Sequence, residues 1–215
     1  MLANNAYTEA WVTIFGSGKK FTYEKGEFII RPGDAPSGVF FIESGIVKAY
    51  DITKYGEENL LIIRKENEIF PLIWAITGAE RHIIYQTLCP TTVWRLSRED
   101  YLAFIDSSPE LTSALLAMSV EMYRIHSERI INLEYRTVRE RLISFMLTMS
   151  RRFGKITPEG TLLKVPLRQQ DIASSINASR ETTSRELTAL EKKGLIKNQS
   201  QFITIIDKAK LKSYL

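Results

Sequence analysis

The sequence has a single cysteine, Cys89, and no apolar run long enough to cross a bilayer. One cysteine excludes an intramolecular disulfide and a cysteine-held iron–sulfur cluster. Its neighbours Leu88 and Pro90 predict a buried, inert thiol. Residues 1–8 lack the basic and apolar segments of a secretory signal. We therefore expect a cytoplasmic protein without a membrane partner.

Motifs of catalysis and metal binding are also lacking. The sequence contains no Gly-x-Ser-x-Gly elbow, no phosphate-binding glycine loop and no His/Cys cluster at metal-ligand spacing. Its two histidines, His82 and His126, are far apart and favour ordinary structural roles over axial haem ligation. The sequence thus predicts neither an enzyme nor a resident metal or haem.

The sequence does contain a charge that changes sign along the chain. Residues 1–136 hold 14 Lys and Arg against 18 Asp and Glu, a formal charge of −4, whereas residues 137–215 hold 15 against 7, or +8. Because Lys and Arg that neutralise phosphates supply most non-specific nucleic-acid affinity, this segregation favours a nucleic acid as partner of the C-terminal part. An incidentally basic surface is the alternative at this stage.

Short β-rich runs fill the region from Lys20 to Leu96. Glycines at 26, 33, 45 and 56 separate them at intervals near the roughly 8–12 residues typical of antiparallel sandwiches and barrels. We predict an α+β fold that opens with an antiparallel, jelly-roll-like β-roll, the sensor domain, over residues 1–107. The predicted strands are 28–30, 39–42, 46–50, 60–63 and 82–85.

A long helix is predicted next, because Ser108-Pro109-Glu110 combines an N-cap, a proline at the first helical position and an acid in the first turn. Two apolar strips run along it, so two partners are expected: the β-roll and a second copy of the chain. A single core helix is the alternative, since Arg129 and Asn132 would continue the first strip. We assign the first strip to a homodimer interface. It comprises Leu111, Leu115, Met118, Met122 and Ile125, and the second comprises Leu116, Val120, Tyr123 and Ile130.

The apolar pattern breaks at residues 134–137, where Thr137 and Glu140 form a capping box for a new helix running to about Phe153. We place a hinge there, which makes residues 108–136 the dimerisation helix and hinge. Residues 137–215 are then a separate C-terminal domain, and a short strand is expected within it at 161–165.

A winged helix-turn-helix is predicted within that domain. Two short helices with apolar inner faces flank the tight turn 177–179, where Ser179 is the N-cap of the second helix. Gly194 ends the second helix, and alternation at Ile203 and Ile205 predicts the β-hairpin wing. The inner-face residues are Ile172, Ala173, Ile176, Leu187 and Leu190.

The second of these helices carries hydrogen-bonding side chains where a recognition helix needs them. Four of them share one face by helical period, and arginine can pair with guanine while glutamate can accept from cytosine. A solvated, ion-paired helix is the alternative. The predicted base-reading residues are Arg180, Glu181, Ser184 and Arg185. The predicted phosphate contacts are Arg168, Gln170, Ser174, Ser175, Thr182, Thr183 and Lys197.

With these residues in place, the chain resembles the CRP/FNR family of bacterial regulators over almost its full length. Residues 179–185 are similar to the S-R-E-T-x-x-R recognition pattern of the cyclic-AMP receptor branch, and they also contain the E-x-x-S-R pattern of the FNR branch. The resemblance implies a homodimeric transcription regulator under allosteric control. Its expected partners are double-stranded DNA with a palindromic operator and RNA polymerase.

The resemblance weakens at the effector site. Where a cyclic-nucleotide sensor shows Gly-Glu and then Arg-Ser or Arg-Thr, this chain reads Pro71-Leu72 and Arg81-His82. Proline removes a backbone donor and leucine removes a carboxylate, so a cyclic nucleotide is not the expected ligand. A pocket for an unidentified small-molecule effector is expected instead, with plain core packing as the alternative. Its residues are Trp74, Arg81, His82, Tyr85 and Tyr123.

A second function class stays open at this stage. The chain fits a cyclic-nucleotide-type regulatory module that acts on a protein partner rather than on DNA. The sequence does not identify the effector or the target genes, and it does not distinguish activation from repression.

Overall fold

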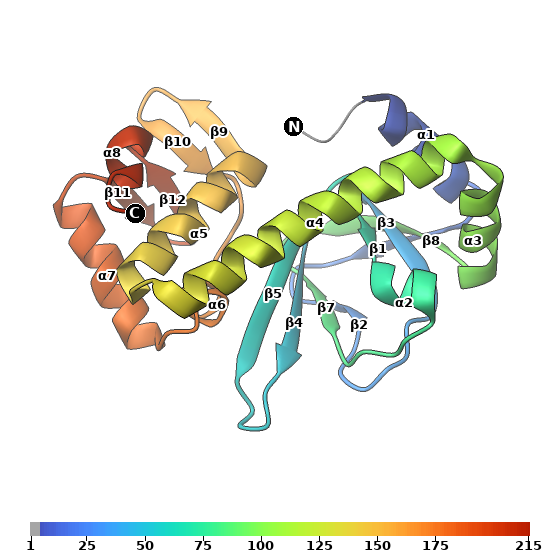
Figure 1. Ribbon diagram of the computed structural model, residues 1–215, viewed down its shortest axis with the longest axis horizontal. Coiled ribbons are helices and arrows are strands. Elements are labelled where there is room, and N and C mark those ends of the chain that lie inside the picture. Colours follow the sequence, from blue (N-terminus) through green and yellow to red (C-terminus); the bar gives the residue numbers. More distant parts are fainter. Residues whose placement is uncertain (1–4) are drawn as a thin grey trace. The chain divides into compact units, whose positions relative to one another are not determined.

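The computed structural model describes residues 5–215, with side chains from residue 8 onward. The chain forms two compact units, one of residues up to 51 together with 61–123, and one of residues 52–60 together with 124–215. The long helix α4 (Pro109–Tyr135) begins in the first unit and ends in the second (Figure 1). The domain boundaries proposed above, after residues 107 and 136, stay predictions.

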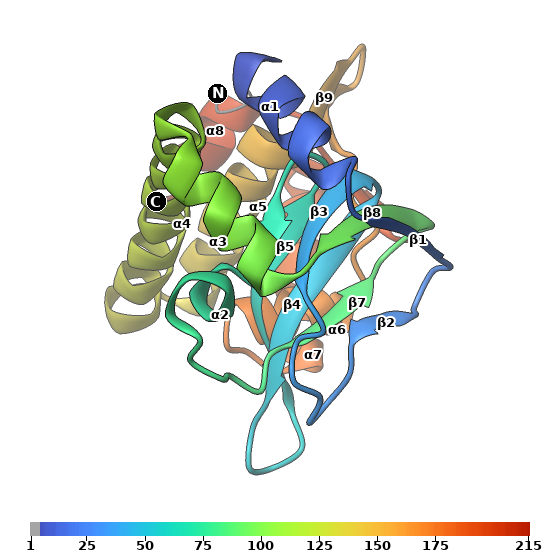
Figure 2. The same cartoon turned by 90° about the vertical axis from the view of Figure 1, so that its right-hand side faces the viewer.

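Two four-stranded sheets form the β-roll of the first unit (Figure 2), as the sequence predicts. Their strand orders are β1-β8-β3-β6 and β2-β7-β4-β5. The strands β1, β6 and β8 were not predicted individually, because β1 and β8 are rich in polar residues and β6 has only two residues. The strands are β1 (Lys19–Tyr23), β2 (Phe28–Ile30), β3 (Val39–Ser44), β4 (Ile46–Ile52), β5 (Glu58–Lys65), β6 (Ile69–Phe70), β7 (Ile84–Thr87) and β8 (Thr91–Leu96).

Helices α1 (Asn5–Phe15) and α3 (Arg98–Ser107) lie side by side at one end of the roll (Figure 2). An aromatic cluster joins them, with ring centroids of Trp11 and Tyr101 6.3 Å apart and those of Phe15 and Phe41 5.3 Å apart. The short helix α2 (Leu72–Thr77) follows β6. This end of the roll holds one hydrophobic cluster of the first unit.

Helix α4 has the two predicted apolar strips, but their assignment is wrong. Leu111 is 3% exposed, and it belongs with Leu115 and Met118 to the core around α1 and α3. The Met122 sulfur accepts a hydrogen bond from Arg64 at 3.2 Å, and Ile125 is buried. This strip therefore packs against its own chain, which leaves less of its surface for a second copy than the other strip offers. The exposed strip is the other one, with Leu116 at 64%, Val120 at 58%, Tyr123 at 75% and Ile130 at 57% exposure.

Helix α5 (Val138–Phe153) opens the C-terminal part of the second unit at the predicted capping box. The Thr137 hydroxyl accepts from the Glu140 amide, and the Glu140 carboxylate accepts from the Thr137 amide. The tip of the β4–β5 hairpin belongs to this unit, and Arg129 donates to Asn59 at 2.8 Å.

The rest of the second unit is a winged helix-turn-helix, as predicted. Its sheet has the order β11-β12-β10-β9, and the predicted strand at 161–165 is β10. The elements are β9 (Gly154–Thr157), β10 (Gly160–Leu163), α6 (Gln169–Ser175), α7 (Arg180–Lys192), β11 (Ile196–Gln199), β12 (Phe202–Ile205) and α8 (Lys208–Lys212). No helix within residues 5–215 has the length and apolar composition that a membrane crossing requires.

Candidate nucleic-acid interface

The turn between α6 and α7 sets the start of the recognition helix. Asn177 adopts a left-handed φ of 50°, and the Ala178 amide donates back to the Ala173 carbonyl at 3.0 Å. The Ser179 hydroxyl then accepts from the Thr182 amide at 3.1 Å, which satisfies one of the free donors at the start of α7. The predicted turn and N-cap are confirmed.

The inner face of α7 fixes how the helix is rotated about its axis. Thr183, Leu187 and Leu190 are at most 1% exposed. Burying a leucine side chain stabilises the fold by about 1.5–3 kcal/mol, so a rotation that exposed this face would be costly. Gly194 follows the helix with φ 65°, a conformation that glycine adopts without strain. The opposite face of α7 is therefore held outward.

The predicted base-reading residues lie on that outward face. The side chains of Arg180 and Glu181 are 61% and 70% exposed, Arg185 is exposed and Ser184 is half-buried. They line a shallow groove of about 560 Å³ along α7. The groove has further polar residues that the sequence interpretation missed, although two of them continue the same helical spacing. These are Gln169, Thr188 and Lys192.

Glu181 is poised to remain an anion. Its own backbone amide donates to its carboxylate, and with the charge of Arg180 this holds the pKa of the Glu181 carboxyl below its ordinary value. Arg180 lies 3.6 Å from the Glu181 carboxylate, and both side chains are mostly solvated, so the pair is weak and each group stays available to a ligand. An ion pair between Glu181 and Arg185, which the alternative of an ion-paired helix requires, is not realised, since Arg185 donates to Thr182 at 3.2 Å.

Helix α5 supports α7 from behind. The Arg139 guanidinium donates to the Glu186 carboxylate at 2.6 Å, and Arg141 donates to the Asn177 carbonyl at 3.4 Å. The Glu186 carboxylate raises the pKa of Arg139, which keeps the guanidinium protonated. The ion pair between Arg139 and Glu186 thus connects the recognition helix α7 to α5, the helix that follows α4.

Two of the predicted phosphate contacts are wrong. Thr183 is fully buried and donates to the Ser179 carbonyl at 2.9 Å, and Ser174 is buried and donates to the Asp171 carbonyl at 3.1 Å. Helical serine and threonine hydroxyls often bond back to the preceding turn in this way, which uses the hydroxyl proton that a phosphate would accept. The sequence alone did not tell which side of each helix they occupy.

The other predicted phosphate contacts stay predictions. Gln170 is exposed, and Ser175 and Thr182 are half-buried. Arg168 caps α6 by donating to Asp171 at 3.1 Å while 56% of its side chain remains exposed. Lys197, on the first wing strand, forms an ion pair of 2.9 Å with Glu159.

The predicted effector residues do not form one pocket. Tyr85 is buried in the roll and its ring stacks on Phe70 with centroids 4.6 Å apart. Trp74 packs against the core around α1 and α3, whereas Tyr123 is 75% exposed and residues 81–82 are exposed. The expectation of a single aromatic pocket formed by all five residues is therefore wrong, although the charge of Arg81 acts on Tyr85.

The roll interior instead contains charged side chains that the sequence interpretation missed. Lys48, Arg64 and Glu68 are at most 9% exposed, and Arg64 lies 3.6 Å from the Glu68 carboxylate. Burial raises the pKa of the neighbouring Tyr85, against the charges of Arg64 and Arg81. The available signal was the interruption of apolar runs by Lys48 and Arg64. Buried charges are costly to desolvate, so these three side chains are exceptions among the apolar residues that fill most of the roll.

Comparison with known proteins follows the same division of the chain. The model of the Crp-like helix-turn-helix domain matches residues 140–214, and the model of the cyclic nucleotide-binding domain matches residues 20–108. A curated relative, the global nitrogen regulator of Nostoc sp., is 30% identical over 187 residues, which are 86% of this chain and 83% of that protein.

Solved structures show the same fold. A CooA mutant from Carboxydothermus hydrogenoformans has a TM-score of 0.80 at 20% identity, over 99% of this chain and 94% of that one. A CRP/FNR-family transcriptional regulator from Thermus thermophilus has a TM-score of 0.71 at 18% identity, over 91% and 97% of the two chains. With the helix-turn-helix geometry and the relatives taken together, this chain belongs to the CRP/FNR family of DNA-binding transcription regulators.

Proposed function

We propose that the protein binds an inverted-repeat operator as a homodimer and that each α7 reads one half-site in the major groove. The observation that supports the proposal is that α7 has one buried face and one exposed, polar face. Thr183, Leu187 and Leu190 seal the inner face, while Arg180 and Arg185 project from the outer one. In a helix-turn-helix dimer, successive recognition helices must lie about 34–36 Å apart to enter grooves one DNA turn apart.

Base reading is assigned to the exposed end of α7. Arginine can form two hydrogen bonds with the O6 and N7 atoms of guanine, so Arg180 and Arg185 select guanine. Glu181, held as an anion, accepts from the N4 group of cytosine and is repelled by backbone phosphate. Ser184 lies between them and bonds either base. Arg168, Gln170, Ser175, Thr182 and Lys197 hold the DNA backbone and fix the register.

The dimer seam is assigned to the exposed strip of α4. Leu116, Val120, Tyr123 and Ile130 keep the 4-3 spacing of a coiled coil, with Ser127 at the position between the last two. Their exposure of more than half each makes an apolar stripe that a single copy leaves in water. Pairing of two α4 helices removes that stripe from water and sets the distance between the two α7 helices.

We assign to the β-roll the control of the distance between the two α7 helices, in response to an effector other than a cyclic nucleotide. Pro71, before α2, has no N–H for a cyclic phosphate, and the Leu72 side chain packs against the core. Residues 135–137 between α4 and α5 absorb the change. Since the protein acts on chromosomal DNA and contacts RNA polymerase, it works in the compartment that holds them, the cytoplasm in bacteria.

The test is fluorescence anisotropy on two labelled duplexes, an operator selected from a random pool and a duplex of scrambled sequence. Arg185→Ala is expected to weaken operator binding by about 1–3 kcal/mol, with little effect on the scrambled duplex. Lys155→Ala, which removes one exposed positive charge on β9, is the matched control and should not discriminate between the two duplexes. Equal losses on both duplexes for Arg185→Ala would overturn base reading.

The same titrations separate this function from the second candidate class. A regulatory module that acts on a protein partner would show no tight, steeply salt-dependent binding to a palindromic duplex. Affinity that falls strongly with added salt, together with preference for the selected operator, supports the DNA-binding role.

A further inference from the structure

A cleft of about 410 Å³ lies between the C-terminal half of α4, helix α5 and helix α8, away from the residues assigned to base reading. Its volume falls within the roughly 300–1,000 Å³ of small-molecule sites. The walls are Glu128, Ile131, Asn132, Arg136, Ser144, Leu147, Thr148, Arg151, Lys208, Lys212 and Leu215. These residues come from the elements on both sides of the α4–α5 corner.

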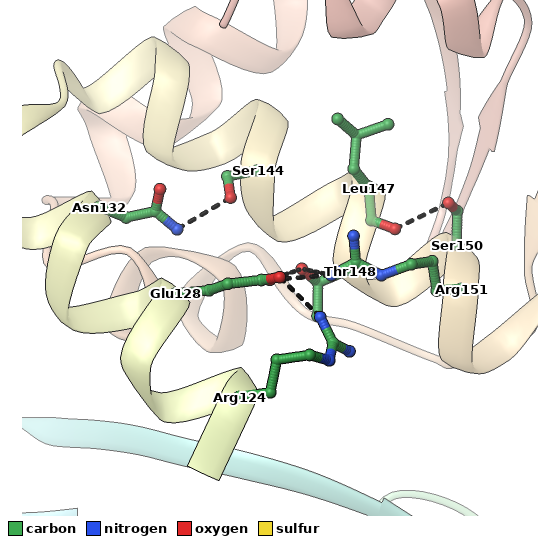
Figure 3. A network of polar contacts seen from close by, with 8 residues as sticks. All are labelled: Arg124, Glu128, Asn132, Ser144, Leu147, Thr148, Ser150 and Arg151. Atoms are coloured by element: carbon green, nitrogen blue, oxygen red, sulfur yellow. Dashed lines mark hydrogen bonds and ion pairs between the residues drawn. The ribbon is translucent and has the colours of Figure 1, made fainter. Parts of the chain in front are cut away.

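The acidic group of the cleft is already neutralised. Figure 3 shows Glu128 of α4 between Arg124 and Arg151, which donate to its carboxylate at 2.6 and 2.8 Å. Two charge-assisted bonds use both carboxylate oxygens, so Glu128 offers little repulsion to an incoming anion.

Positive charge at the cleft exceeds what Glu128 can balance. Arg136, Lys208 and Lys212 also line it, and within the part of the chain that the structure describes the two lysines form no salt bridge. The charge of Arg136 acts on Glu140, whose side chain is engaged with Thr137. The cleft therefore has a surplus of cationic donors at one side.

The floor of the cleft is apolar with two neutral hydrogen-bonding groups. Ile131 is 53% exposed, and Leu147 of α5 is nearly buried beside it. The Asn132 amide donates to the Ser144 hydroxyl at 2.8 Å (Figure 3), and among the described residues that hydroxyl has no acceptor for its own proton. Ser144 is 9% exposed and lines the cleft, so its hydroxyl is a buried polar group at the cleft wall.

We propose that this cleft binds a small organic anion. Its charged head, a carboxylate, sulfonate or phosphate, lies against Lys208, Lys212 and Arg136, and its apolar body covers Ile131 and Leu147. The DNA backbone would use the lysines alone and leave the apolar floor without a role, which is why a small amphiphilic anion fits better than a nucleic acid. The ligand touches α4 and α5 together, so it is a second input placed at their corner.

The test uses the full chain and the fluorescent probe 8-anilinonaphthalene-1-sulfonate, an aromatic sulfonate. The double variant Lys208→Gln/Lys212→Gln should lower the affinity for the probe about tenfold or more, because two charge-assisted contacts are lost. The matched control Lys155→Gln/Lys210→Gln removes the same charge from exposed positions outside the cleft, one of them on α8 itself. It should keep the affinity within about twofold of the original, because neither side chain lines the cleft.

Amide chemical shifts locate the probe. Saturable shifts at Ser144, Thr148 and Lys212 support the proposal. Shifts confined to the β-roll, equal affinity of the two double variants, or displacement of the probe by scrambled duplex DNA would each overturn it. Competition by inorganic phosphate tells whether the head group alone is sufficient, and the expected result is weak competition because phosphate has no apolar body. Since no operator is used, the outcome does not depend on base reading by α7.

Discussion

Helix α4 has two apolar strips with similar composition and opposite surroundings. Leu111 is buried in the cluster around α1 and α3 and the partly buried Leu115 and Met118 pack against it, whereas Leu116 and Val120 are more than half exposed. Both strips follow the periodicity of a coiled coil, so periodicity predicts that a face will be covered without telling what covers it. The contacts of the first unit decide that the strip of Leu111 packs into its own core and that the other strip stays exposed.

The largest expected effect is on the free energy of unfolding, and it tests directly whether the two strips differ. Leu111→Ala should lower the free energy of unfolding by about 2–5 kcal/mol, because it leaves a cavity in a packed core. Leu116→Ala should change that free energy by no more than about 0.5 kcal/mol in the monomer, because its side chain is 64% exposed. Urea unfolding at a dilution where both variants are monomeric measures the difference.

Self-association of the same two variants, Leu111→Ala and Leu116→Ala, should show the opposite order of effects. Sedimentation at higher concentration should show weaker dimers for Leu116→Ala. A Leu111→Ala chain that stays folded should associate normally. A result with the roles of the two residues exchanged would restore the first strip as the seam.

A smaller effect is expected on α7, where the inner and outer faces differ in the same way. Thr183→Val keeps the shape of the side chain but removes the hydroxyl that donates to Ser179, and should cost about 1 kcal/mol of unfolding free energy. Its affinity for scrambled DNA should be unchanged, because the side chain is fully buried. Denaturant unfolding and anisotropy measure the two quantities.

Thr182 is the matched position for that experiment, one residue away and half-buried at the surface. Thr182→Val should weaken binding to scrambled DNA if it contacts phosphate. Equal weakening by the variants at 182 and 183 would contradict the distinction between the two faces.

The smallest effect concerns the capping box between α4 and α5. Hydrogen bonds from the Thr137 side chain and then its backbone hold the pKa of the Glu140 carboxyl below its usual value of 4.5. A carboxyl with a lowered folded-state pKa stabilises the fold above the unfolded-state pKa, and this contribution is lost as the pH falls through the folded-state value. The melting temperature of Glu140→Gln should therefore be below that of the original chain at pH 7, and the gap should close on acidification below 4.5.

Calorimetry across that pH range makes the test, with Glu134→Gln as control for the same change of charge at an exposed position. The control should show no comparable gap. A gap for Glu140→Gln that is independent of pH would mean that the carboxylate hydrogen bonds are not its source.

The helix-turn-helix was predictable because its signals are local. Ser179 caps α7 through an amide three residues on, Gly194 ends the helix with a positive φ, and Thr137 with Glu140 forms a box within four residues. Such interactions depend on few neighbours, so residue type and spacing are sufficient to infer them. The outward face of α7, with Arg180 and Arg185, follows from the same helical period.

Long-range packing decided the rest. Residues far away in the sequence decide which strip of α4 lies inside. They also decide that Thr183 and Ser174 turn inward and that Lys48 and Arg64 are buried in the roll. The cleft among α4, α5 and α8 exists only because three separate segments meet. By itself the sequence determined the helix-turn-helix and its polar reading face, through short-range hydrogen bonds and helical period. Only the tertiary structure decided which equivalent apolar face became core, because burial free energy depends on the whole set of neighbours rather than on local spacing.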